Sequence, residues 1–334
     1  MLVNDSTYTD YDLSAIKVLK DFIPDKVFDV HAHLFDSRFL PNVHPASYGA
    51  VVGDIEAYQK AMAPMLCNPK ELRANIIIFP DKAMANNSNG TCAMSDSFLV
   101  RELEKSSDNM GEIIVSPHES AEDIEKRLVH PRIRGLKCYH YMNQADVTWN
   151  LSIGEYLPES AWEVAQKHKL CITLHMVKDH ALADKDNMEY ICAMAKKYPD
   201  VVLILAHAAR SFAAWTAIES VGKIARFENV WFDFSANCES PAMFKIMQKV
   251  GVERCMWGSD YPVSAMHGKA ISIGDTFHWI YESECDGHRA LPKKFWLIGI
   301  ENLMALRQAC LLAELSKSDI EKLFYHNAMS LFGL

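Results

Sequence analysis

Short apolar runs alternate with longer amphipathic stretches along most of this 334-residue chain. The run at 201–207 is continuously apolar, which is typical of a strand buried on both faces. Others end in a polar residue or a proline, as the run at 75–79 does before Pro80. The pattern predicts eight strands, at 26–31, 75–79, 112–116, 134–140, 171–175, 201–207, 230–235 and 255–260.

Helical spacing fills most of the intervals between these strands. Met188, Ile191 and Ala195 fall on one helix face, and Pro199 ends that helix. Asp54 is a suitable N-cap for the helix that follows it. The predicted helices cover 10–22, 54–65, 95–105, 121–128, 158–168, 188–198, 212–226, 242–250, 295–314 and 318–331.

This alternation favours parallel pairing and an α/β fold. Eight such units close into a (β/α)8 TIM barrel, which we expect to be distorted, with long loops at its C-terminal mouth. A doubly wound open sheet is the alternative, but its glycine-rich strand-to-helix turn does not occur here. We expect a single domain over 1–334, with a leader and short helix at 1–25 and a long loop insertion at 261–294.

Two connecting segments, 34–52 and 261–294, are too long to be simple connectors. Both follow strands at the mouth end of the predicted barrel. We therefore expect both segments to cover the pocket and to influence specificity.

Composition restricts the class of partner. Hydrophobic residues make up 49% and charged residues 23%, as in ordinary globular proteins, and the net charge is −9. No basic run supports a nucleic-acid partner, and no segment approaches the roughly 20 apolar residues that a membrane span needs. Residues 1–21 lack an apolar signal core, and the nine cysteines are scattered and odd in number. We expect a cytoplasmic protein with a small-molecule substrate, and a homodimer is compatible with the sequence.

Histidines and an aspartate lie at the ends of several predicted strands. In a barrel these ends meet at one mouth, and residues two apart on a strand share a face. A single histidine there is usually structural, whereas five ligand-type residues together indicate a metal or catalytic cluster. Nitrogen donors outnumber oxygen donors, which suits zinc, with manganese, iron or cobalt as alternatives. The five residues are His31, His33, His175, His207 and Asp260.

Six segments spread over nearly the whole chain carry a family resemblance. They are 28–33 (Phe-Asp-Val-His-Ala-His), 134–137, 173–175, 205–208, 257–262 (Trp-Gly-Ser-Asp-Tyr-Pro) and 326–332. With these segments the chain resembles the amidohydrolase superfamily. More narrowly, it is similar to the amidohydrolase-related family, which includes aminocarboxymuconate semialdehyde decarboxylase, resorcylate-type decarboxylases and pyrone dicarboxylate lactonases.

The resemblance implies roles for the cluster. In mononuclear members, residues matching His31, His33, His175 and Asp260 bind one divalent metal ion. The residue matching His207 orients or deprotonates water. A metal lowers the pKa of bound water toward ~7, and an imidazole can move the proton at neutral pH. Asp260 is an alternative base.

Lys137 raises the question of a second metal. In two-metal amidohydrolases, a strand-four lysine is carbamylated and bridges the ions, and Lys137 lies near that place. Alternatively, an unmodified lysine binds a substrate carboxylate or caps the barrel. We expect one metal and a free lysine.

Other polar residues are candidates for substrate binding. His140 ends the fourth predicted strand, Arg38 lies in the 34–52 segment, and Arg210 follows His207. An arginine can bind a carboxylate, although Arg210 can equally form a structural ion pair. Asp233 and Ser235 share a strand face, which a buried structural network explains equally well.

The leading functional hypothesis is metal-dependent hydrolysis of a small ester, lactone or amide. The alternative is non-oxidative decarboxylation of a carboxylated ring or unsaturated acid at the same site, because both reactions share the ligand set. Metal-dependent deoxyribonucleases also share the barrel, but the net charge and Lys137, where their glutamate is expected, count against a nuclease. A catalytically inactive binding protein is a further class, against which the intact cluster argues.

Overall fold

The computed structural model describes residues 8–43, 50–85, 90–285 and 294–334. Within these residues, eight parallel strands follow one another around a curved sheet, and the short strand β2 (Val52–Gly53) pairs antiparallel with β1. The parallel strands are β1 (Lys26–Asp36), β3 (Glu71–Ile78), β4 (Met110–Val115), β5 (Ile133–Cys138), β6 (Cys171–Leu174), β7 (Leu203–Leu205), β8 (Val230–Asp233) and β9 (Cys255–Met256).

Backbone hydrogen bonds join the two ends of this sheet. The amide of Val30 lies 3.3 Å from the carbonyl oxygen of Trp257, and the amide of Asp260 donates to His31 at 2.8 Å. The amide of His33 donates to Tyr261, also at 2.8 Å. These bonds close the sheet between β1 and the chain around β9, which confirms the predicted (β/α)8 barrel.

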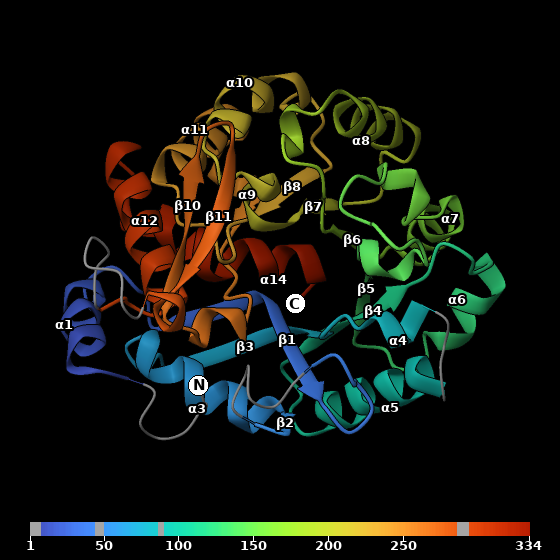
Figure 1. The fold of residues 1–334 in the computed structure, drawn as a ribbon, viewed down its shortest axis with the longest axis horizontal. Helices are drawn as coiled ribbons and strands as arrows, with labels where there is room; N and C mark the ends of the chain where they lie inside the picture. The colour runs from blue at the N-terminus through green and yellow to red at the C-terminus, as the bar shows by residue number, and fades with distance from the viewer. Residues whose placement is uncertain (1–7, 44–49, 86–89, 286–293) are drawn as a thin grey trace.

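Helices surround the barrel, as Figure 1 shows. The Asp54 side chain accepts from the amide of Ala57, so the predicted N-cap of α3 is confirmed. The helices are α1 (Asp10–Leu19), α3 (Ile55–Met65), α4 (Lys82–Ala85), α5 (Thr91–Glu104), α6 (Ala121–Arg127), α7 (Glu159–His168), α8 (Lys185–Lys197), α9 (Ala206–Arg210), α10 (Trp215–Ile224), α11 (Ser240–Val250), α12 (Ile298–Leu312), α13 (Lys317–Glu321) and α14 (Asn327–Phe332).

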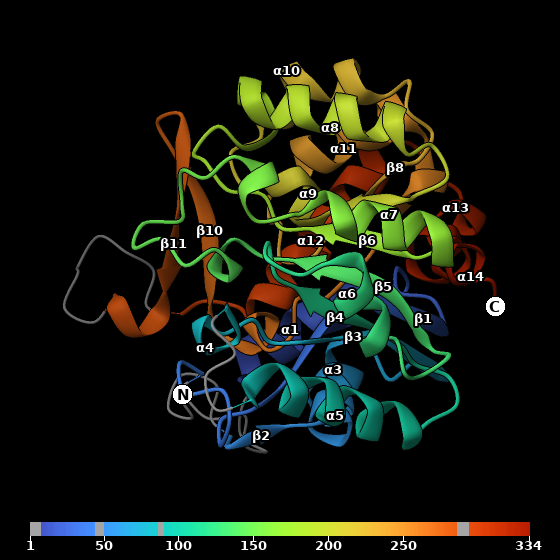
Figure 2. The same ribbon diagram turned by 90° about the vertical axis from the view of Figure 1, so that its right-hand side faces the viewer.

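One end of the barrel is closed by apolar side chains. Phe28 at the start of β1 stacks on Phe332 of α14 with ring centroids 5.4 Å apart, in a buried cluster that includes Ile204 and Met256. Figure 2 shows α13 and α14 at this end and the strands β10 and β11 at the other. The mouth that can admit a ligand is therefore the end with β10 and β11.

The insertion after β9 is not the plain loop that the sequence predicted. Its described part forms an antiparallel hairpin of β10 (Gly268–Ile273) and β11 (Thr276–Tyr281). Gly274, with φ +61°, takes the first central position of the two-residue turn. The polar stretch 86–89 and the parts of the two long segments at 44–49 and 286–293 lie outside the described residues.

Strand ends differ from the prediction at three functional positions. β1 continues past His31 to Asp36, because its carboxyl half pairs with β3 and with the chain after β9. β7 ends at Leu205, two residues before His207. His140 lies in a 3₁₀ turn (His140–Met142) after β5 rather than on the strand.

No helix of the described residues combines the length and the apolar character that crossing a bilayer requires.

Candidate metal centre and active site

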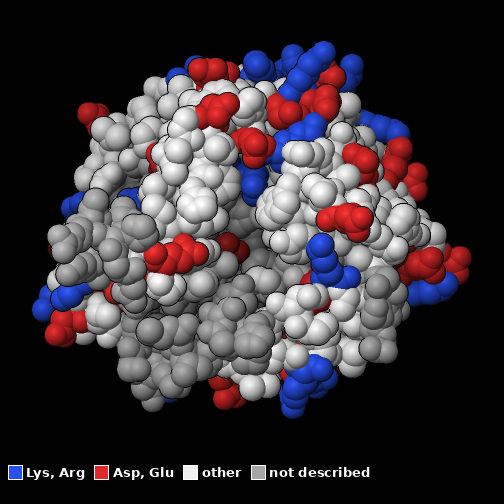
Figure 3. Space-filling model, in the orientation of Figure 1, with Lys and Arg blue, Asp and Glu red and all other residues white. Residues whose placement is uncertain are grey.

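The structure brings together all five residues that the sequence singled out. His31 and His33 come from β1, whereas the other three follow β6, β7 and β9. All five side chains are buried, and none is more than 8% exposed. Figure 3 shows a hollow in the middle of the face that Figure 1 presents, with acidic and basic atoms at its edge.

Two histidines and the aspartate form one side of the cluster. His31 Nε2 lies 3.1 Å from His33 Nε2, as expected for side chains two apart on a strand. Asp260 Oδ1 lies 3.4 Å from His33 Nε2 and 3.6 Å from His31 Nε2. Three donor atoms from two segments thus converge on one point.

His175 and His207 form the other side. His175 Nδ1 lies 3.2 Å from His207 Nε2, and His207 Nδ1 lies 4.0 Å from Asp260 Oδ2. Donor atoms of His31, His207 and Asp260 all lie within 4.8 Å of one another, so these three side chains can reach one ion. This set includes His207, to which the family resemblance gave the acid/base role.

The backbone at His207 has an unusual conformation. Residues 207–210 have φ between +54° and +58°, and none of them is glycine. A left-handed conformation costs roughly 1–2 kcal/mol per non-glycine residue. The turn is held from outside, since the His207 amide donates to Asp233 Oδ1 at 3.2 Å and Asn237 Nδ2 donates to the His207 carbonyl. Strain of this kind is found at functional sites, where the surrounding structure fixes it.

Asp233 and Ser235 support two of the histidines. Asp233 Oδ2 lies 2.9 Å from His31 Nδ1, and Ser235 Oγ lies 2.9 Å from His207 Nδ1. Ser235 Oγ also donates to Asp233 Oδ1. The shared strand face predicted from the sequence is thus in contact with the cluster.

Burial sets the protonation of the cluster. It lowers the pKa of His31 and His33 well below the ordinary value, and the Lys137 cation adds to the effect. Burial also lowers the pKa of His207 to about 4, against the opposing Asp260 charge, and raises the pKa of Asp260 to about 6. At pH 7 the imidazoles are therefore neutral and Asp260 is ionised, which is the state that a divalent cation requires.

The donor set fits a metal ion. It combines neutral imidazole nitrogens with one carboxylate in a buried position. The nitrogens that face the cluster are Nε2 of His31 and His33 and Nδ1 of His175, and each can present a lone pair to an ion in its neutral form.

Lys137 reaches the cluster from β5. Its side chain is fully buried, and its Nζ lies 3.0 Å from His31 Nε2. Burial lowers the pKa of Lys137, while the charges of Asp233 and Glu112 act in the opposite direction.

Glu112 on β4 is a buried acid that the sequence did not single out. Its Oε1 accepts from Asn75 at 2.7 Å and from Thr173 at 2.8 Å, while Oε2 has no partner among the described residues. Burial raises the pKa of Glu112 to about 7, although the Lys137 charge opposes this. The available signal was an acidic residue at the start of an otherwise apolar strand.

His140 and Arg210 lie next to the cluster. The His140 ring is 5.8 Å from the His175 ring and 4.3 Å from the Trp149 ring, and its Nδ1 lies 2.7 Å from Thr148 Oγ1. Burial lowers the pKa of His140 to about 3, and the Arg210 charge adds to this shift. The Arg210 guanidinium lies 5.2 Å from the Trp149 ring centroid.

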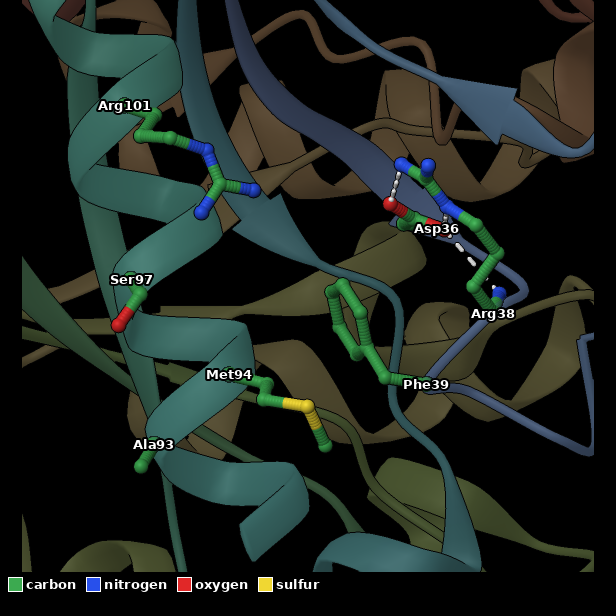
Figure 4. A pocket seen from close by; sticks show the side chains of 7 residues that line it. All are labelled: Asp36, Arg38, Phe39, Ala93, Met94, Ser97 and Arg101. Carbon is green, nitrogen blue, oxygen red and sulfur yellow. Dashed lines mark hydrogen bonds and ion pairs between the residues drawn. The ribbon is translucent and has the colours of Figure 1, made fainter.

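Arg38 lies apart from the histidines. Its Nε donates to Asp36 Oδ1 at 2.8 Å, and a second nitrogen donates to Oδ2 at 2.5 Å. Together with Arg101 and Ser97 of α5, it lines a separate pocket of about 380 Å³ (Figure 4). The part that Arg38 plays in substrate binding stays a prediction.

The sequence profile of the amidohydrolase family matches residues 28–334. No curated protein sequence matches the chain.

Several solved structures have a similar fold. A zinc-bound amidohydrolase from Burkholderia multivorans is 12% identical, with a TM-score of 0.57 over 92% of this chain and 99% of that one. A protein described as a 2-pyrone-4,6-dicarboxylic acid hydrolase from Pseudomonas putida is 13% identical, with a TM-score of 0.58 over 92% and 97% of the two chains. The 2,6-dihydroxybenzoate decarboxylase from Rhizobium is 12% identical, with a TM-score of 0.57 over 92% and 98%. At these identities the similarity concerns the fold alone.

Proposed function

The chain belongs to the amidohydrolase family, and on that premise we propose that it is a metal-dependent hydrolase of a small ester, lactone or amide. The observation that carries the proposal is the buried cluster of four histidines and one aspartate at the barrel mouth. Neutral imidazoles beside an ionised carboxylate suit a divalent cation better than any role in packing.

We assign His31, His33, His175 and Asp260 as the residues that would hold one divalent ion. Zinc is our first choice, with manganese, iron and cobalt as alternatives. The fold is shared with a zinc-bound amidohydrolase, which supports this choice. When bound, such an ion supplies Lewis acidity, which lowers the pKa of water and polarises a carbonyl group.

His207 is assigned as the general acid/base. Its pKa of about 4 leaves the imidazole neutral at pH 7, so it can accept a proton from water and return it to the leaving group. Ser235 Oγ, 2.9 Å from Nδ1, fixes the ring. Asp260 is the alternative base, since its carboxylate also faces His207.

Lys137, His140 and Arg210 are assigned to substrate binding, with Arg38 as a more distant candidate. The substrate is a small molecule, and the proposal involves neither nucleic acid nor membrane. No disulfide joins any of the nine cysteines, all of which lie among the described residues, and this fits a reducing cytoplasm. Assembly as a homodimer stays a prediction.

The second candidate is non-oxidative decarboxylation of a carboxylated ring or unsaturated acid. It is supported by the cationic Arg210 among aromatic rings beside the cluster and by the fold shared with 2,6-dihydroxybenzoate decarboxylase. The two reactions use the same residues, so their products must distinguish them.

A substrate panel tests the proposal. Zinc-loaded protein is incubated in ¹⁸O-labelled water with lactones, esters, amides and aromatic carboxylic acids, and the products are analysed by mass spectrometry and CO₂ release. Hydrolysis places one ¹⁸O atom in the product acid and releases no CO₂. Release of CO₂ without ¹⁸O incorporation would reject hydrolysis and favour decarboxylation. The His31→Ala/His33→Ala protein is the inactive control.

A further inference from the structure

We propose that Arg210, whose guanidinium lies over the rings of Trp149 and Phe277, forms an anion subsite beside the histidine cluster, and that Phe277 of the β10–β11 hairpin determines selectivity for carboxylate-bearing substrates. This inference rests on the proposed function and deepens it. The hairpin then has a defined role in specificity, whereas the sequence predicted only that segment 261–294 covers the pocket and influences specificity.

The guanidinium lies over two aromatic rings from separate segments. Arg210 is 5.2 Å from the Trp149 ring centroid and 5.0 Å from that of Phe277. Trp149 comes from the segment before α7, whereas Phe277 lies on β11. Stacked aromatic faces restrain a planar guanidinium and leave its edge free for hydrogen bonds.

One buried nitrogen of the Arg210 guanidinium, Nε, has no hydrogen-bond partner within the described chain. Burial lowers the pKa of Arg210, against the opposing influence of Tyr139 and Tyr156. A carboxylate bound in bidentate fashion would satisfy this atom and the charge together, whereas a neutral group would not.

The subsite adjoins the candidate metal centre. The Trp149 ring lies 4.3 Å from the His140 ring, which in turn stacks on the His175 ring at 5.8 Å. The ring centroids of Tyr139 and His175 are 4.3 Å apart. A small planar molecule could therefore place its anionic group at Arg210 while another part faces the histidines.

The hairpin is fixed in the position that this subsite needs. Phe277 packs on Phe212 with ring centroids 4.6 Å apart, and Phe212 stacks on His207 at 5.8 Å. At the turn, Trp215 donates to the Asp275 carbonyl at 3.0 Å, and the Asp275 carboxylate lies 2.9 Å from His180 Nε2. Phe277 is thus a positioning residue that acts through Arg210.

Binding of benzoate and benzamide to the zinc-loaded full chain, measured by calorimetry, tests the subsite without requiring turnover. We expect benzoate to bind at least tenfold more tightly than benzamide, and Arg210→Gln to remove the difference. Phe277→Leu should weaken benzoate roughly 2- to 30-fold, the range of a cation–π contact, and leave benzamide unchanged. Phe277→Trp should retain the wild-type preference.

Arg226→Gln is the matched control, because Arg226 is exposed and stacks on the single ring of Phe227. It should bind both probes as wild type does. The proposal would be overturned if wild type bound benzoate and benzamide equally tightly, or if it bound neither probe measurably. So would an undiminished benzoate preference in Phe277→Leu.

A further variant separates this inference from the proposed reaction. The His31→Ala/His33→Ala protein should keep its preference for benzoate, because the preference is assigned to Arg210 and not to the metal. Retention would support the subsite even if no substrate of the panel is hydrolysed. Loss of the preference in this variant would assign anion selectivity to the metal and reject the subsite.

Discussion

The Nδ1 atom of His31 lies 2.9 Å from Oδ2 of Asp233, and both side chains are buried. A carboxylate at this distance accepts a hydrogen bond from Nδ1–H and so leaves the Nε2 lone pair directed at the cluster. Asp233 therefore fixes both the orientation and the tautomer of a candidate metal ligand.

Asp233→Asn should weaken metal binding about 10- to 100-fold, the usual effect of removing such a support. The amide cannot replace a carboxylate as the acceptor for both His31 and the His207 backbone. Zinc affinity is measured by competition with a chelator. Asp186→Asn on α8, an exposed position, is the control, and unchanged affinity in Asp233→Asn would contradict the role.

Metal content tests the centre itself. Purified protein should contain about one divalent ion per chain, and the His31→Ala/His33→Ala protein should contain none. Inductively coupled plasma mass spectrometry gives both values. A double variant that keeps its full complement of metal would refute the assigned ligands.

Much of the barrel and the cluster could be predicted, because both depend on local patterns. A short apolar run followed by a histidine indicates a buried strand and its end, and a parallel barrel brings such ends together. This reasoning located His31, His175 and Asp260 without any knowledge of contacts. The N-cap at Asp54 could be predicted in the same way, because it depends only on the residues that follow it in the sequence.

Features that depend on contacts between distant segments were not predicted. The left-handed turn at His207 is stabilised by Asp233 and Asn237, which lie far along the chain. Glu112 gains its significance only from its burial beside Lys137. The hairpin at 268–281 did carry a local signal, because alternating apolar and polar residues flank the Gly274-Asp275 turn. The length of the insertion nevertheless favoured the prediction of a loop.

His207→Asn should leave the metal bound and lower kcat by roughly 10²–10⁴, the usual share of general acid–base catalysis. Asparagine has a similar reach but cannot take up a proton at neutral pH. Turnover and metal content are measured on the same preparation. Because His207 donors also lie within reach of an ion shared with His31 and Asp260, a parallel loss of metal would make His207 a ligand instead.

In the metal-free protein, Glu112→Gln should raise the free energy of unfolding above that of wild type, and this difference should grow as the pH rises. The pKa of Glu112 is about 7 in the fold, against 4.5 ordinarily, so folding favours the protonated form. The stability that this form contributes is complete below about pH 4.5 and is lost as the pH rises through 7, by up to about 3 kcal/mol. Glutamine keeps the acceptor for Asn75 and Thr173 but cannot ionise.

Urea unfolding of both proteins at pH 5 and pH 8 measures this effect. The free energy of unfolding of Glu112→Gln should exceed that of wild type at pH 8 and approach it at pH 5. A difference that does not depend on pH would show that Glu112 is not protonated in the folded protein.

Lys137 decides between one metal and two. Two-metal hydrolysis needs an anion that bridges the two ions, and lysine supplies one only when it is carbamylated. In that arrangement His175 and His207 would both be ligands of the second ion. Burial lowers the pKa of Lys137, which favours carbamylation, but the charge of Asp233 favours the cation. With one metal, His207 is free to transfer protons, and Lys137, 3.0 Å from His31 Nε2, can hold a substrate anion.

We therefore expect one ion per chain whether or not bicarbonate is present during purification, and a native mass without the 44 Da of a carbamate. Lys137→Gln should keep that ion and lower kcat/KM, because a substrate-binding cation is lost rather than a bridge. Lys105→Gln, at an exposed surface position on the C-terminal side of α5, should leave both values unchanged. Anomalous diffraction that shows two ions roughly 3.5–4 Å apart, with additional density on Lys137 Nζ, would establish the two-metal arrangement and reject the free lysine.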